Sequence, residues 1–339
     1  MIKHLLEKIT AKENLTVEEA YSLMETIMNG ELNNSHLAGM LLALRTKGET
    51  ARELAGFVKA MRDKSVKIKS PSEYTIDLCG TGGDGSGTFN ISTAASFVAA
   101  GAGIYVAKHG NRSISSKCGS ADLLKQLGIN ISLSPDKAEK ALSEIGIAFL
   151  FAPDYHPSMK FASSVRSELG MKTIFNILGP LTNPAGTKRQ LIGTFSSKAS
   201  AIMSEAADYL DMEKICFVNS AGMYDEISLS FDTEVIEYSN NSGLKKYSLT
   251  SADFCYPAAE PLNLKGDGAE ENASIILEVL KEKKINDPFR VIAANASAAL
   301  YCAGFSEYLS DCTAAAEESI LSGKAYEKLV KLKEFGDKA

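Results

Sequence analysis

The segment 77–128 gathers glycine, hydroxyl and basic side chains in a pattern that suits the binding of an anion. Its first part is the run GTGGDGSGT at residues 80–88, between an apolar segment at 74–79 and a helical pattern at 90–101. Glycine lets the backbone adopt positive φ and bring N–H groups close to a ligand, and the following helix presents unpaired N–H groups at its start. We expect Asn90, Ser92 and Thr93 to cap this helix. Taken alone, the run is equally compatible with a tight turn between a strand and a helix, because such turns use glycine for steric reasons.

A second cluster follows the next apolar segment, residues 104–107, which completes a β-α-β unit with the first strand and helix. The cluster comprises Lys108, His109, Asn111, Arg112, Ser113, Ser115 and Ser116. We place it at the carboxyl end of a strand, where open α/β sheets bind ligands. Cations together with neutral donors suit phosphate oxygens, and Ser120 is expected to cap the next helix beside them. A solvated basic loop is the alternative, but such a loop has little need of so many glycines and serines around so few charges.

An acidic pair, Asp225 and Glu226, follows the predicted strand at 214–219. Adjacent acids are usually solvated surface residues, and this is the simpler alternative. In proteins Mg²⁺ commonly takes one or two carboxylates together with substrate phosphate and water. Because the pair follows a strand of the same predicted sheet, we expect it to bind magnesium at the edge where the phosphate-binding turns lie.

The composition is that of a large, acidic chain. It has 339 residues, 45% of them hydrophobic, and a net charge of −6, so it can bury a large core and divide into two lobes. No apolar run approaches the ~20 residues that a membrane span needs, and we expect a cytoplasmic protein with no membrane partner. The acidic charge argues against a general nucleic-acid binder. The six cysteines show no Cys-x-x-Cys spacing and are expected to be mostly buried thiols.

Residues 1–70 have the pattern of a small helical domain. Two segments, Thr16–Glu19 and Thr50–Glu53, have the form of capping boxes and precede apolar stripes at helical spacing. The stripes expose too much apolar surface for a single helical layer, so they must pack on one another, on a larger lobe or across a dimer. The sequence leaves these three options open.

Beyond residue 70, short apolar strands alternate with helical patterns. The strands are expected at 74–79, 104–107, 147–151, 190–195, 214–219, 233–238 and 245–249. The helices are expected at 90–101, 120–127, 136–145, 157–169, 198–210, 269–283, 288–303 and 313–333. This alternation predicts an α/β domain, residues 71–339, with a central, mainly parallel sheet flanked by helices on both faces. The last two strands are predicted to form a hairpin.

The order of the motifs resembles that of the anthranilate phosphoribosyltransferase family. The matching segments are GTGGD at 80–84, NIST at 90–93, KHGNRSISS at 108–116, GSAD at 119–122, FLFAPDYHPSMK at 149–160, VRSELGMKTIFNILGPLTNPAG at 165–186, DEIS at 225–228 and NASAALY at 295–301. The resemblance implies a homodimer formed through the helical domain 1–70, joined by part of 171–186. It also implies transfer of a phosphoribosyl group from phosphoribosyl pyrophosphate to the amine of anthranilate, a step of L-tryptophan biosynthesis.

The resemblance further implies a role for each matching residue. Lys108, Asp225 and Glu226 would be catalytic, and two Mg²⁺ ions per subunit would be held by Ser92, Asp225 and Glu226. Phosphoribosyl pyrophosphate would be bound by Gly80, Gly83, Asp84, Thr88, Asn90, Ile91, Ser92, Thr93, Lys108, His109, Gly110, Asn111, Arg112, Ser113, Ile114, Ser115, Ser116 and Ser120. Anthranilate would be bound by Gly80, Asn111 and Arg166. Without the resemblance, the pattern favours Arg166 as a surface residue paired with Glu168 or a neighbouring acid, and His156 reads equally as a capping or packing residue.

Two rival functions belong to proteins of the same expected fold. A pyrimidine nucleoside phosphorylase has Lys-His-Ser-Asn-Arg where this chain has KHGNR, and it binds free phosphate, so it has less use for a magnesium-binding acidic pair. A noncatalytic paralogue that binds nucleic acid predicts a basic groove, whereas this chain is acidic. Cys118, Tyr155 and Tyr224 depart from the usual family pattern, although none of them removes a functional group.

Overall fold

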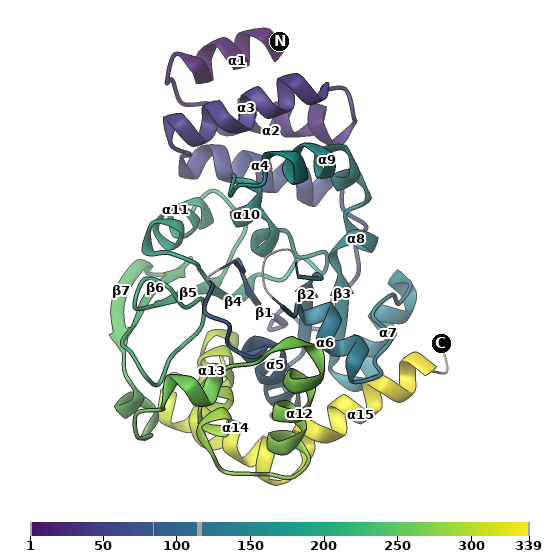
Figure 1. The fold of residues 1–339 in the computed structure, drawn as a ribbon, viewed down its shortest axis with the longest axis vertical. Coiled ribbons are helices and arrows are strands. Elements are labelled where there is room, and N and C mark those ends of the chain that lie inside the picture. The colour runs from purple at the N-terminus through teal and green to yellow at the C-terminus, as the bar shows by residue number, and fades with distance from the viewer. Residues whose placement is uncertain (1, 84, 114–116, 338–339) are drawn as a thin grey trace.

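A computed structural model describes residues 2–83, 85–113 and 117–337, and its chain begins with a layer of four helices (Figure 1). These are α1 (Ile2–Thr10), α2 (Val17–Met28), α3 (Asn34–Lys47) and α4 (Ala51–Asp63). Both predicted capping boxes are confirmed: the N–H of Glu19 donates to Thr16 Oγ1 at 3.2 Å, and that of Glu53 donates to Thr50 Oγ1 at 3.3 Å. Glu53 is fully buried and also accepts from Lys47 Nζ at 3.0 Å. The local signals in the sequence therefore determine where α2 and α4 begin.

The larger part of the chain is built on one seven-stranded sheet. The strands are β1 (Ile76–Gly80), β2 (Val106–Gly110), β3 (Ile147–Phe151), β4 (Arg189–Gly193), β5 (Lys214–Ser220), β6 (Thr233–Ser239) and β7 (Gly243–Leu249). Their order is β3-β2-β1-β4-β5-β6-β7, with the first five parallel and the last two antiparallel. The mainly parallel sheet and the β6–β7 hairpin are thus confirmed.

Helices cover both faces of this sheet. The helices that follow α4 are α5 (Ile91–Gly101), α6 (Ser120–Gln126), α7 (Pro135–Ile145), α8 (Ala152–Tyr155), α9 (Lys160–Leu169), α10 (Phe175–Leu178), α11 (Ser197–Ala207), α12 (Gly268–Leu280), α13 (Asp287–Ala303), α14 (Leu309–Leu321) and α15 (Lys324–Asp337). Leu78 faces the core beneath α5 and α13, whereas its neighbour Cys79 faces the core shared with α4, α10 and α11. Figure 1 shows α5 and α12–α15 on one side of the sheet and α4, α10 and α11 on the other.

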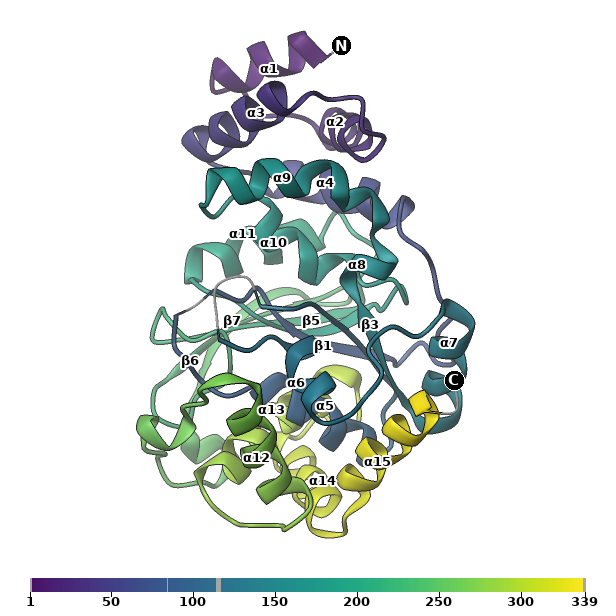
Figure 2. The ribbon, with the colours of Figure 1, turned by 45° about the vertical axis from the view of Figure 1, so that its right-hand side comes forward.

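The helical layer extends beyond the first four helices. α9 packs on α2 and α3, and an added Cβ at Gly30 would meet the Phe161 ring at 2.6 Å. Figure 2 shows α9 lying beside α4, above the sheet. One continuous hydrophobic core runs from α1 through α9 and α10 to the sheet. The predicted helical stripes therefore pack on one another and on the larger lobe, while their role in a dimer and the boundary at residue 70 stay predictions.

Three expected elements differ from the observed ones. The helix expected at 313–333 is two helices, α14 and α15, separated at Gly323, whose φ is +87°, so that α15 can pack on α5. The helix expected at 157–169 begins as a 3-10 turn, Pro157–Met159, before α9. Strand β2 runs to Gly110 instead of ending at 107, because Lys108 and His109 continue the pairing with β3. These two residues therefore lie inside the sheet and not in the loop after it.

The remaining composition-based expectations concern cysteines and membranes. All six cysteines are free thiols; five are buried and Cys255 is exposed. Within residues 2–83, 85–113 and 117–337, no helix is long and apolar enough to cross a membrane.

Candidate active site

The glycine-rich turn after β1 encloses the Asp225 carboxylate. Gly82 and Gly83 have φ of +64° and +70°, which glycine adopts without steric cost, and Gly82 N–H donates to Asp225 Oδ2 at 3.0 Å. An added Cβ at Gly80 would stand 2.5 Å from the same oxygen, and one at Gly193 would stand 1.5 Å from the Asp225 carbonyl oxygen. Gly80 and Gly193 are paired residues at the ends of β1 and β4. The two missing side chains make the space that the acidic segment occupies.

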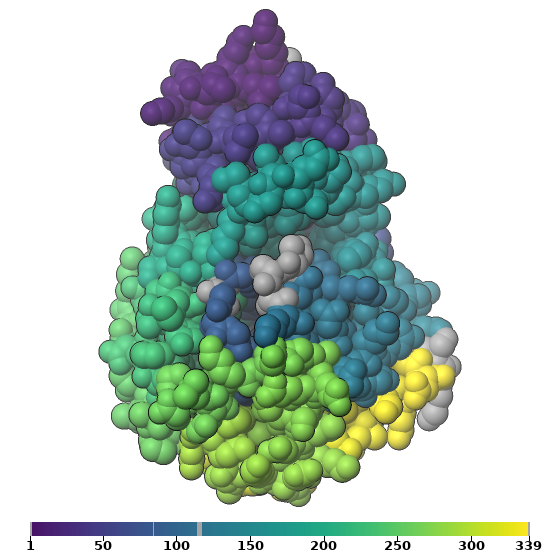
Figure 3. All heavy atoms as spheres, in the orientation of Figure 1, coloured from purple at the N-terminus to yellow at the C-terminus, as the bar shows by residue number. Residues whose placement is uncertain are grey.

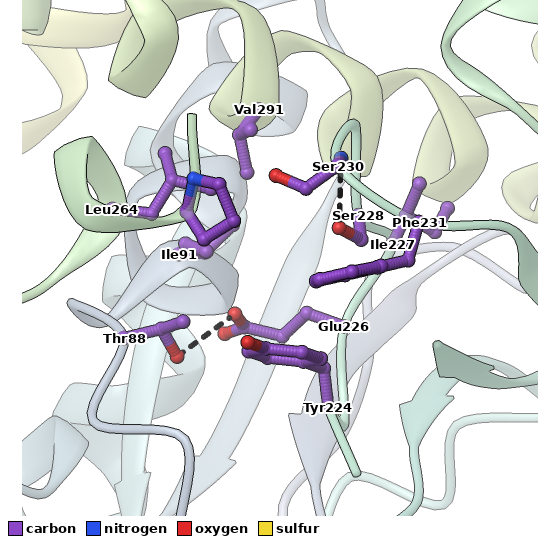
Figure 4. Close-up of a pocket in the computed structure, with 11 residues that line it drawn as sticks. Thr88, Ile91, Tyr224, Glu226, Ile227, Ser228, Ser230, Phe231, Leu264 and Val291 are labelled. Carbon is purple, nitrogen blue, oxygen red and sulfur yellow. Dashed lines mark hydrogen bonds between the residues drawn. The ribbon is translucent and has the colours of Figure 1, made fainter. Parts of the chain in front are cut away.

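The acidic segment is also held from its other side. The Asn295 amide on α13 accepts from Ile227 N–H at 3.0 Å and donates to Ile227 O at 2.9 Å, and Ser220 Oγ donates to Glu226 O at 2.6 Å. Glu226 Oε2 accepts from Thr88 Oγ1 at 3.4 Å (Figure 4). Together with the bond from Gly82 to Asp225, this contact links the acidic pair to both parts of the glycine-rich turn. An open pocket lies beside Glu226, with Tyr224 and Phe231 stacked on one wall. The prediction that Asp225 and Glu226 lie at the phosphate-binding edge of the sheet agrees with this geometry.

The donor set fits a hard divalent cation. Two carboxylates lie beside a turn that suits phosphate, and Ser92 supplies a hydroxyl from the first turn of α5. Among the described residues, no group of three or more His, Cys, Asp or Glu side chains forms a closed metal site. Two carboxylates and a hydroxyl are oxygen ligands of the kind that Mg²⁺ takes together with substrate phosphate and water.

Lys108 is a buried residue beside Ser92. Its side chain is buried, and Nζ donates to Leu78 O at 2.6 Å and to Ser92 Oγ at 3.4 Å. Burial lowers the pKa of Lys108, and the charge of Asp77 partly opposes this. Asp77 is itself fully buried, which raises the pKa of its carboxyl to about 6 although Lys108 acts in the opposite direction. The desolvation cost therefore exceeds the mutual attraction for both groups, and a negatively charged ligand near Nζ would favour the charged amine.

The N-terminus of α5 is open. Asn90 occupies the N-cap position, but its side chain makes no capping hydrogen bond, so that part of the prediction is wrong. The amide is held elsewhere: Nδ2 donates to Cys118 O at 3.3 Å and to Asn272 Oδ1 at 3.0 Å. Ser92 Oγ accepts from Lys108, and Thr93 Oγ1 is buried without a hydrogen-bond partner in the described structure. No predicted capping side chain therefore covers the first N–H groups of α5, and a phosphate could bind there.

The loop after β2 folds back onto α6. Gly119, and not Ser120 as predicted, is the N-cap of α6, because the Asp122 carboxylate accepts from Gly119 N–H and Ser113 N–H, each at 3.0 Å. Ser120 Oγ instead donates to Asn111 O at 3.3 Å. Gly110 is needed here, since an added Cβ would meet Phe149 at 2.6 Å.

The residues predicted to bind phosphoribosyl pyrophosphate also include Gly83, Ile91 and Arg112. Ile91 is buried at the start of α5, Gly83 O accepts from Lys172 Nζ at 2.7 Å, and the Arg112 guanidinium lies 5.8 Å from the centre of the Phe151 ring. Figure 3 shows the dark-blue atoms of the glycine-rich segment at the surface, between the teal helices and the light-green segment. The predicted residues Asp84, Ile114, Ser115 and Ser116 lie outside the described residues.

Arg166 lies on α9, away from the strand ends. Its guanidinium stacks 5.0 Å from the centre of the Phe175 ring, and partial burial lowers its pKa. In the part of the chain that the structure describes, Arg166 forms no ion pair, so the alternative pairing with Glu168 is not found. No described hydrogen bond links it to Gly80 or Asn111, the other two predicted anthranilate residues.

Two buried histidines lie near the end of β2. The rings of His109 and His156 are 5.1 Å apart, and burial lowers their pKa values to about 3 and about 4. Both rings are therefore neutral at pH 7. The Nε2 atom of each is buried without a hydrogen-bond partner among the described residues.

Three residues that shape the site were not predicted from the sequence. Gly193 makes room for Asp225, Asn272 holds Asn90, and Lys172 binds the glycine-rich turn from the segment between α9 and α10. Gly193 was the one detectable signal, because it is a glycine inside the strand predicted at 190–195, and such a glycine often marks a close approach of another backbone segment.

Comparison with known proteins agrees with this geometry. The model of a glycosyl transferase family matches the chain in two parts, a helical bundle domain at residues 3–65 and an a/b domain at residues 72–326. The anthranilate phosphoribosyltransferase of Geobacillus kaustophilus (strain HTA426) is 44% identical over 333 residues, covering 98% of each chain. The crystal structure of the enzyme from Thermus thermophilus superposes with a TM-score of 0.91 at 38% identity, covering 98% of this chain and 99% of that one.

The enzyme from Saccharomyces cerevisiae has been solved with bound ligands. Its complex with PRPP and Mg has a TM-score of 0.90 at 26% identity, covering 100% of this chain and 98% of that one. Its complex with 4-fluoroanthranilate has a TM-score of 0.87 at 26% identity, covering 98% of this chain and 97% of that one.

The fold and the two family matches thus define a glycosyltransferase with a helical domain and an α/β domain. The particular family within this class is shown by curated relatives that are similar over the full length of the chain. This chain belongs to the anthranilate phosphoribosyltransferase family. The comparisons do not support either rival, the pyrimidine nucleoside phosphorylase or the nucleic-acid-binding paralogue.

Proposed function

We propose that this chain transfers the 5-phosphoribosyl group of phosphoribosyl pyrophosphate to the amine of anthranilate, giving N-(5-phosphoribosyl)anthranilate and pyrophosphate in L-tryptophan biosynthesis. The observation that carries the proposal is the contact between the acidic segment and the glycine-rich turn, in which Gly82 N–H binds Asp225 and Thr88 binds Glu226. An anion site and two hard oxygen ligands meet at one sheet edge. The yeast relative has been solved in complex with PRPP and Mg, which supports the use of these two ligands by this chain.

On the donor side, the protein groups are arranged to stabilise negative charge. Displacement at C1 of the ribose leaves charge on the departing pyrophosphate, so preorganised N–H groups and cations should supply most of the catalysis. We propose that the turn N–H groups, the start of α5 and Lys108 bind the leaving group. Two Mg²⁺ ions per subunit, held by Ser92, Asp225 and Glu226, would neutralise the charge of the pyrophosphate when bound.

On the acceptor side, Arg166 is proposed to bind the carboxylate of anthranilate, with Asn111 and Gly80 contacting the same substrate. Arg166 forms no ion pair within residues 2–83, 85–113 and 117–337, and a guanidinium is suited to a planar carboxylate. The aryl amine is unprotonated at neutral pH, so the attack needs no strong base. The neutral state of His109 and His156 is compatible with an uncharged wall for the aromatic ring.

The test is the magnesium-dependent loss of anthranilate fluorescence when phosphoribosyl pyrophosphate is added. Purified, folded protein should consume anthranilate only when both Mg²⁺ and the donor are present. Folded protein that shows no loss would contradict the proposal. Release of base from uridine or thymidine in the presence of phosphate would point instead to the phosphorylase reaction.

Assembly and location are separate proposals. We expect a homodimer through the domain at 1–70, with part of 171–186 contributing, and a cytoplasmic location. Light scattering on the purified chain should give twice the 36.3 kDa monomer mass. A monomer at micromolar concentration would contradict the dimer without affecting the assignment of the reaction.

A further inference from the structure

Asn272 on α12 is a buried amide that binds Asn90 twice. It is 1% exposed, and its Oδ1 accepts from Asn90 N–H at 2.8 Å and from Asn90 Nδ2 at 3.0 Å. Its own Nδ2 donates to Gly268 O at 2.6 Å. The two asparagines lie 182 positions apart in the sequence, so this contact joins α12 to the start of α5.

Backbone groups determine the direction of every bond in this network. The Asn90 N–H can only donate and Gly268 O can only accept, which fixes the oxygen and nitrogen of the Asn272 amide. Asn90 Nδ2 then faces two acceptors, Asn272 Oδ1 and Cys118 O. A flipped Asn90 amide would place an oxygen against both of these acceptors, so the network excludes it.

The network leaves one functional group of Asn90 for a ligand. Both Nδ2 hydrogens are used, while Oδ1 accepts no hydrogen bond from any residue that the structure describes. Asn90 is half-buried and stands between Thr88 and Ser92, both at the site. An amide oxygen repels phosphate oxygens and attracts a hydroxyl donor.

We propose that Asn272 is a positioning residue that holds the Asn90 amide with its oxygen toward the donor substrate, so that Asn90 accepts a hydrogen bond from a ribose hydroxyl. This inference rests on the proposed function, because it assumes a ribose-containing donor at the turn. It assigns Asn90 to the sugar, whereas Lys108 and the turn N–H groups bind the phosphates.

The experiment compares three ligands on the full-length protein in the presence of Mg²⁺ and without anthranilate. The ligands are phosphoribosyl pyrophosphate, its analogues lacking the 2- or the 3-hydroxyl, and inorganic pyrophosphate, with affinity measured by titration calorimetry. One neutral hydrogen bond should make the wild type prefer the full substrate over one of the analogues by about 3- to 10-fold. Asn272→Ala should lose that preference while its affinity for pyrophosphate stays within about twofold.

Two further variants complete the design. Asn90→Ala should lose the same preference, and the double variant should show no additional loss, because the two residues act as a unit. Ser274→Ala, an exposed position on the same helix, should behave as the wild type. If Asn272→Ala failed to fold, Asn90→Ala would still decide whether Asn90 binds a hydroxyl.

Several outcomes would overturn the inference. If Asn272→Ala weakened the binding of phosphoribosyl pyrophosphate and of pyrophosphate equally, the Asn90 amide would act on the phosphates or the metal. If Asn90→Ala kept the preference for the full substrate, Asn90 would not bind a ribose hydroxyl. Failure of the proposed function is distinguishable, since the wild type would then bind neither the substrate nor its analogues.

Discussion

Replacing Gly193 by alanine should displace the acidic segment from the glycine-rich turn. A Cβ on Gly193 would stand 1.5 Å from the carbonyl oxygen of Asp225, and such contacts essentially never fall below 3.0 Å. The Asp225 backbone must therefore move by about 1.5 Å. Strand β4 cannot move instead, because Gly193 is paired with Gly80 on one side and Val218 on the other.

The displacement should cost catalysis more than stability. A shift of that size breaks the 3.0 Å bond from Gly82 N–H to Asp225 and moves Glu226 away from Thr88. Misplacing a catalytic group by about 1 Å can lower a rate by about 100-fold, so we expect kcat/KM to fall by about 100-fold or more. More Mg²⁺ should be needed for half-maximal rate. Gly80→Ala should be milder, because its Cβ meets the rotatable end of the Asp225 side chain at 2.5 Å.

The assay is the initial rate of anthranilate fluorescence loss over a Mg²⁺ titration, with circular dichroism to check folding. Gly39→Ala is the matched control: it lies in α3 with nothing within 4 Å of the added Cβ, and it should keep full activity and gain about 0.5–1 kcal/mol of stability. If Gly193→Ala kept kcat/KM and the Mg²⁺ response within about twofold of wild type, the reasoning about the strand-end glycines would be wrong.

Three further predictions concern other parts of the site. Arg166→Ala should raise the KM for anthranilate by about tenfold with little change in kcat, and Arg166→Lys should not restore it; Michaelis curves at saturating donor check this, and an unchanged KM would mean that the carboxylate binds elsewhere. Lys172→Ala removes the 2.7 Å bond to Gly83 O and should raise the KM for the donor about threefold, while a KM equal to wild type would show that the turn holds its shape unaided. The folded-state pKa values of His109 and His156 are about 3 and about 4, against an ordinary value of 6.5. As the pH falls below 6.5, the unfolded chain therefore binds more protons than the folded one. Urea unfolding should thus show a lower free energy of unfolding at pH 4.5 than at pH 7. Asp77, with a pKa of about 6 against 3.8, acts in the opposite direction but is one group against two; His156→Gln should reduce the pH dependence, and an unchanged dependence would exclude His156 as its source.

Local signals in the sequence predicted the parts of the fold that local interactions determine. The capping boxes at Thr16 and Thr50 form because their donors and acceptors are three residues apart. The end of β2 was not predicted correctly, since Lys108 interrupts the apolar run that marks a strand. The strand continues because the Lys108 amine finds Leu78 O and the charge of Asp77 on the neighbouring strand, both of which are contacts across the sheet.

The start of α5 shows why the rest of the site requires the structure. Asn90 is a favoured N-cap residue, and the sequence alone predicts that its side chain binds the first N–H groups of the helix. Asn272 and Cys118, which are remote in sequence, bind that amide instead. The N–H groups at the start of α5 that this cap would satisfy are among those that we propose for the phosphate of a substrate. No pattern within residues 80–101 indicates that the Asn90 amide is held by residues outside that segment.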